Sequence, residues 1–97
     1  MIDSLMKKFI DVSEKRSDIL KKIKDLENDI LSITERIEEI KYDQEMQPTE
    51  RIDAHSKARD KRKRVRTEIA EMEHEARMYD AQIAKIKMQI RVEANGK

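Results

Sequence analysis

Apolar residues recur at alternating spacings of three and four along most of the chain, and one interruption divides this pattern. In the first part a single seam, broken only by Arg16, comprises Ile2, Leu5, Phe9, Val12, Ile19, Ile23, Leu26, Ile30, Ile33, Ile37 and Ile40. Beyond the lone proline, Pro48, a second seam comprises Val65, Ile69, Met72, Ala76, Tyr79, Ile83, Ile86 and Ile90. This spacing is typical of long helices that pack along their length.

The proline marks the predicted boundary between the two helices. Pro48 has no backbone N–H and restricts Gln47 to extended geometry, and it suits the first position of a new helix. We therefore expect helices at about residues 3–45 and 49–94, joined by a turn at about 46–49.

The heptad positions, labelled a to g, also change phase at this proline. In the first helix Ile2 is an a position and Leu5 is a d position. If that register continued past Pro48, Arg51 would be an a position. In the second seam the a position is instead His55, four residues later. The repeat and the backbone are therefore interrupted at the same place.

Two architectures fit this pattern: an antiparallel hairpin, or a single kinked rod that pairs with a second chain. Repeats of nearly equal length and a short loop favour the hairpin. Setting the turn at Gln47-Pro48 makes facing residue numbers sum to about 95. The expected layers are Ile40/His55, Ile37/Ala58, Ile33/Arg62, Ile30/Val65, Leu26/Ile69, Ile23/Met72, Ile19/Ala76, Arg16/Tyr79, Val12/Ile83, Phe9/Ile86 and Leu5/Ile90. In this register the guanidinium of Arg16 could stack on the ring of Tyr79.

The repeat predicts an all-α fold, an antiparallel two-helix coiled-coil hairpin that forms one domain over residues 1–97. The composition agrees with a coiled coil. Charged residues are 44% of the chain and aromatic residues 3%, with one Gly and one Pro, a profile closer to coiled coils than to globular domains. Highly charged chains are often disordered, but disordered chains lack regular apolar spacing. The periodicity therefore predicts an ordered protein.

A single seam between two helices buries little apolar surface for a chain of this length, so we expect a partner helix. Assembly into a four-helix bundle or a higher homo-oligomer would supply it. The residues predicted to form this oligomer interface lie outside both seams, at the end far from the turn: Met6, Ile10, Leu20, Met78, Ala81, Ala84 and Met88. The alternative is that they are ordinary scattered surface apolar residues.

One basic segment is the feature most indicative of a ligand. Residues 57–66 carry seven cations against one carboxylate, a net of +6, whereas residues 25–45 carry eight carboxylates against two cations, a net of −6. The favoured interpretation is that these segments match each other across the hairpin. Otherwise the run would contact nucleic acid, an acidic partner or a targeting receptor through Lys57, Arg59, Lys61, Lys63, Arg64 and Arg66.

Catalytic and metal-binding patterns are lacking in the sequence. There is no cysteine and no glycine-rich loop, and the serines are spread along the helices. Glu71 and His74 have the spacing of a di-iron helix, but both occupy outward heptad positions, which indicates a solvated face. We expect no enzyme activity, no cofactor and no metal.

The location and role of the protein follow from the remaining features. The first ten residues lack the layout of a signal peptide, the uncharged stretches are short, and the net charge is +1, so we expect a soluble cytoplasmic protein that binds no membrane. The leading hypothesis is a non-enzymatic coiled-coil protein that acts by protein–protein interaction, as a structural piece, adaptor or small inhibitor. The alternative is a nucleic-acid-binding hairpin that uses residues 57–66.

Overall fold

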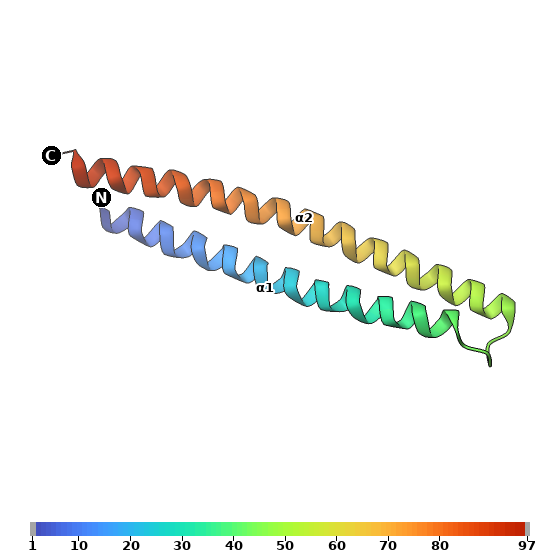
Figure 1. The fold of residues 1–97 in the computed structure, drawn as a ribbon. Coiled ribbons are helices and arrows are strands. Elements are labelled where there is room, and N and C mark those ends of the chain that lie inside the picture. The colour runs from blue at the N-terminus through green and yellow to red at the C-terminus, as the bar shows by residue number, and fades with distance from the viewer. Residues whose placement is uncertain (1, 97) are drawn as a thin grey trace. The chain divides into compact units, whose positions relative to one another are not determined.

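The computed structural model describes residues 2–96, which form two long helices and no strand. Helix α1 spans Ile2–Lys41 and helix α2 spans Pro48–Asn95 (Figure 1). The chain divides into two compact units, each made of a segment of α1 and a segment of α2. The described part of unit 1 is residues 2–22 with 72–96, and unit 2 is residues 23–71. The expected single domain over 1–97 includes two residues outside the described range and stays a prediction.

Unit 2 contains the connection between the helices, and this connection differs from the expected turn. Helix α1 ends at Lys41, four residues before the expected end near 45, and residues 42–47 form an irregular loop. The carboxylate of Asp43 accepts a hydrogen bond from the backbone N–H of Glu45 at 3.0 Å. Aspartate side chains that bond locally in this way compete with helical hydrogen bonding, which accounts for the earlier end of α1.

Arg51 holds this loop against the first turn of α2. Its guanidinium donates to the backbone carbonyl oxygens of Asp43, at 2.6 Å, and Met46, at 3.2 Å. The backbone N–H of Arg51 also donates to the carbonyl of Gln47 at 2.9 Å, the first bond of the helix that Pro48 opens. The Arg51 side chain therefore supplies a hydrogen-bond donor to two loop carbonyl groups that lie outside both helices.

We predict that Arg51→Ala destabilises the protein by about 1–3 kcal/mol, because it leaves part-buried loop carbonyls without their donor. Arg64→Ala is the matched control, since the Arg64 side chain is exposed and forms no hydrogen bond or ion pair with residues 2–96. Urea denaturation measures both variants. Equal losses of stability in the two would contradict this role of Arg51.

The seam of unit 2 is the one predicted from the apolar pattern. On α1, Ile23, Ile33, Ile37 and Ile40 are buried, and Leu26 and Ile30 are half-buried. The facing positions of α2 are all half-buried; they are His55, Ala58, Arg62, Val65 and Ile69. The two helices pack against each other along the expected heptad positions, which confirms the predicted helical pairing.

Unit 1 brings the beginning of α1 beside the end of α2 (Figure 1). Ile19, Ala76 and Ile86 are buried, and the other seam residues from Leu5 to Ile90 within this unit are half-buried. The ammonium of Lys87 lies over the ring of Phe9, 5.8 Å from its centroid. Arg16 forms an ion pair with Asp80. Since a later residue of α1 meets an earlier residue of α2, the two segments run antiparallel.

The expected stacking of Arg16 on Tyr79 is not found. The guanidinium of Arg16 instead donates to the carboxylate of Asp80, the next residue, because an ion pair with a charge-assisted hydrogen bond is a stronger partner than a ring face. Tyr79 donates its hydroxyl to Glu75 at 3.2 Å. Partial burial, together with this carboxylate, raises the pKa of the Tyr79 hydroxyl above its ordinary value of 10.0.

Neither helix, over residues 2–96, combines the length and the apolar character that crossing a membrane requires.

Candidate functional site: a cationic groove on unit 2

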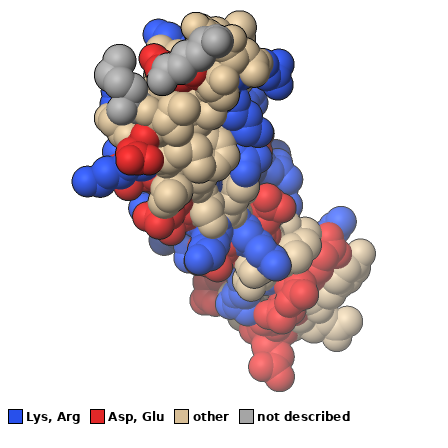
Figure 2. All heavy atoms as spheres, turned by 90° about the vertical axis from the view of Figure 1, so that its left-hand side faces the viewer, with Lys and Arg blue, Asp and Glu red and all other residues tan. Residues whose placement is uncertain are grey.

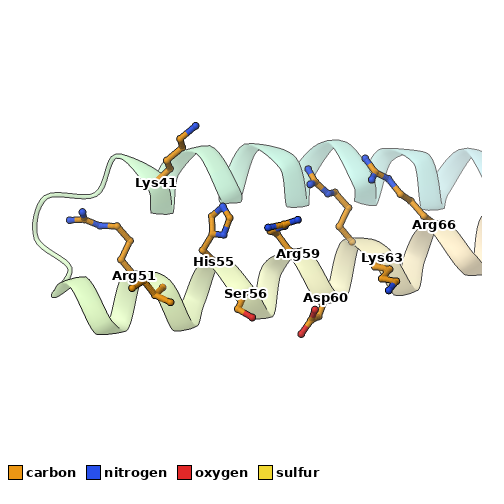
Figure 3. Close-up of a pocket in the computed structure, with 10 residues that line it drawn as sticks. Lys41, Arg51, His55, Ser56, Arg59, Asp60, Lys63 and Arg66 are labelled. Carbon is orange, nitrogen blue, oxygen red and sulfur yellow. The ribbon is translucent and has the colours of Figure 1, made fainter.

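A surface groove of about 680 Å³ lies along one side of unit 2 (Figure 3). One residue of α1, Lys41, lines it, and all the others belong to the first part of α2. The lining residues are Lys41, Arg51, Ile52, His55, Ser56, Arg59, Asp60, Arg62, Lys63 and Arg66.

The helical repeat explains why these residues share one side of α2. Ile52, Arg59 and Arg66 occupy e positions, and Ser56 and Lys63 occupy the adjacent b positions. Residues three or four apart are neighbours on a helix surface, so this spacing lines up their side chains beside the seam. The groove is therefore the e and b flank of the basic segment.

Positive charge dominates the groove. Six of its lining residues are Lys or Arg, and Asp60 is the one carboxylate among them. In Figure 3 the side chains of Arg59 and Arg66 extend from α2 toward α1, whereas those of Ser56 and Asp60 point away from α1. The carboxylate is thus directed away from the two guanidinium groups on the inner side.

The groove cations differ in how they are held. Arg51 binds the loop carbonyls, and Arg62 donates to the hydroxyl of Thr34 at 3.3 Å. By contrast, the charged groups of Arg59, Lys63 and Arg66 form no hydrogen bond or ion pair with any residue in 2–96. These three exposed cations are available to an external anion.

The predicted charge matching across the hairpin does not take the form of ion pairs. Two ion pairs are local, Arg36–Glu39 and Lys57–Asp53, and the pair that joins α1 to α2 among the described residues lies in unit 1. Six of the carboxylates of residues 25–45 lie on α1, and three of them, Asp25, Glu35 and Glu39, occupy c and f positions that face away from the seam. The net charges of the two segments are equal and opposite, but their charged side chains form no ion pair with each other.

The six cations named from the sequence divide between two sides of α2. Arg59, Lys63 and Arg66 line the groove, whereas Lys57, Lys61 and Arg64 lie outside it, at c and g positions. The site predicted from the sequence did not include the other seven groove residues; they are Lys41, Arg51, Ile52, His55, Ser56, Asp60 and Arg62. Heptad positions would have separated the two groups of cations and would have placed Arg62 with the groove residues. Lys41 belongs to the groove only because α1 packs beside α2.

The residues predicted to form an oligomer interface are all exposed in unit 1. They fall into two groups, which we call the α1 stripe (Met6, Ile10 and Leu20) and the α2 set (Met78, Ala81, Ala84 and Met88). The α1 stripe occupies e and b positions beside the seam, and most of the α2 set occupies c and f positions on the side of α2 opposite α1. Figure 2, in which unit 1 faces the viewer, shows uncharged surface with both basic and acidic side chains at its edges.

No cluster of three or more His, Cys, Asp or Glu side chains within residues 2–96 is placed to hold a metal ion. Glu71 and His74 are both exposed. The groove can attract and hydrogen-bond an anion, because its donors are guanidinium and ammonium groups.

Comparison with protein-family models, curated proteins and solved structures finds no match to this chain.

Proposed function

We propose that this chain is a non-enzymatic helical hairpin that acts by protein–protein interaction, beginning with its own assembly into a four-helix bundle. A structural, adaptor or inhibitor role follows from such an assembly. The observation that carries the proposal is the apolar surface that unit 1 leaves exposed outside its seam.

Within this exposed apolar surface, the α1 stripe gives the clearest support for assembly. Its three side chains are 41% to 51% exposed, although large apolar residues at this spacing are usually covered. No large side chain among the described residues is completely buried, so the seam itself remains partly open to water. Another helix laid against the stripe would cover it and seal the adjoining seam.

The flank next to the stripe favours a second copy as the covering partner. On this side α2 presents the e-position residues Asp80 and Lys87, which contact Arg16 and Phe9 of α1. An opposite copy, related by a twofold axis, would bring its own stripe against this one and place charged flanks of both signs around it. The α2 set then remains on the outside, where its methionines suit an adaptable partner surface.

We expect the wild type to be a dimer or larger at micromolar concentration, and Ile10→Glu with Leu20→Glu to convert it to monomers that keep most of their helicity. The reason is that two charges per copy would be buried in the stripe contact. Sedimentation measures mass, and circular dichroism measures helix content.

The matched control is Leu31→Glu with Ile52→Glu, which adds the same charges at exposed apolar positions of unit 2. This control should stay assembled. A wild type that sediments as a monomer and melts sharply would overturn the proposal.

A further inference from the structure

We infer that the cationic groove of unit 2 binds the phosphate backbone of double-stranded nucleic acid. This function is separate from the proposed assembly through unit 1, and it uses different residues.

The first support is the local concentration of positive charge without internal neutralisation. The net charge of the whole chain is only +1, so attraction to an anion must come from one surface rather than from the protein as a whole. Arg59, Lys63 and Arg66 lie on one side of α2 with no partner in residues 2–96, and Lys41 extends the same surface from α1.

The second support is the length of the groove, which indicates a linear polyanion. From Arg51 to Arg66 the helix rises about 22 Å, at about 1.5 Å per residue. One strand of a duplex presents a phosphate about every 3.4 Å along the helix axis, so this length faces about six phosphates. A small anion would contact only one or two of these cations.

The third support is the kind of side chain that lines the groove. Arginine and lysine make charge-assisted bonds to phosphate oxygens. None of the lining residues is Phe, Tyr or Trp, and His55 is the one aromatic ring among them, so the groove has no row of rings on which successive bases of a single strand could stack. The groove is therefore suited to the backbone of a duplex, read without regard to sequence.

The test is fluorescence anisotropy with a labelled 20-base-pair duplex of DNA and one of RNA, at salt concentrations from 50 to 200 mM. If Arg59, Lys63 and Arg66 each contact one phosphate, the slope of log affinity against log salt is about −2.7. Affinity then falls about 40-fold over this fourfold range of salt. A single strand of the same length should bind more weakly.

The sharpest comparison uses two triple variants with the same change in charge. Arg59→Glu with Lys63→Glu and Arg66→Glu should reduce duplex affinity more than tenfold at 50 mM salt and abolish the salt slope. Lys57→Glu with Lys61→Glu and Arg64→Glu alters the other sides of the same segment and should retain most of the affinity and the slope. Circular dichroism confirms that both variants remain helical.

Two results would overturn the inference: wild-type protein that binds neither duplex at 50 mM salt, and equal losses of affinity in the two triple variants. If the wild type binds neither duplex and the groove variant also loses assembly in sedimentation, the anion in the groove is the acidic surface of a second copy.

Discussion

Ile40→Ala should reduce the free energy of unfolding by about 2–5 kcal/mol, the range typical of removing a large aliphatic side chain from a packed site. Ile40 is only 2% exposed, and it is the most deeply buried member of the unit 2 seam. Ile52→Ala removes the same atoms from a site that is 71% exposed, and it should change stability by no more than about 0.5 kcal/mol. Urea denaturation of the two variants, compared with the wild type at one protein concentration, measures both effects.

The comparison between the two isoleucines tests the packing rather than the composition. Both residues lie in unit 2, so both substitutions probe the same pair of helical segments, although Ile52 lines the groove and Ile40 does not. A similar loss of stability in both variants would contradict the seam described here. It would mean that Ile52 is covered in solution, either by a different helix register or by a partner seated on the groove side.

The apolar seams were predictable because burial along a helix follows one periodic rule. Each a or d position predicted between Leu5 and Ile90 is buried or half-buried, including the intruding Arg16. The loop was less predictable, because the end of α1 depends on interactions outside the repeat. The Asp43 side chain bonds to the backbone of Glu45, and Arg51 reaches back from α2 to the loop carbonyls.

The same holds for the candidate site: the helical repeat predicts some of its residues, and others depend on how the two helices pack. Net charge located the basic segment, but it does not say toward which side of the helix each charge points. It therefore suggested ion pairs with the carboxylates of residues 25–45, and these ion pairs do not form. Heptad positions supply that direction and separate Arg59, Lys63 and Arg66 from the other cations. The contribution of Lys41 could not be predicted from either rule alone, because it depends on how far α1 extends beside α2.

The distance between two spin labels tests the antiparallel pairing of α1 and α2 in unit 1 most directly. Asp11 and Lys85 are exposed residues that line one shallow groove between the helices. The chain contains no cysteine, so Asp11→Cys with Lys85→Cys allows labels at these two sites alone. Helices in contact lie about 8–10 Å apart, so the labels should be within about 20 Å of each other.

The measurement should be repeated after dilution with an excess of unlabelled chain. We predict that the distance of about 20 Å persists, because both labels belong to the same hairpin. A separation near 100 Å, as expected for a continuous helix between these positions at about 1.5 Å per residue, would contradict the hairpin. So would a short distance that vanishes on dilution, since it would then arise between two chains paired as rods.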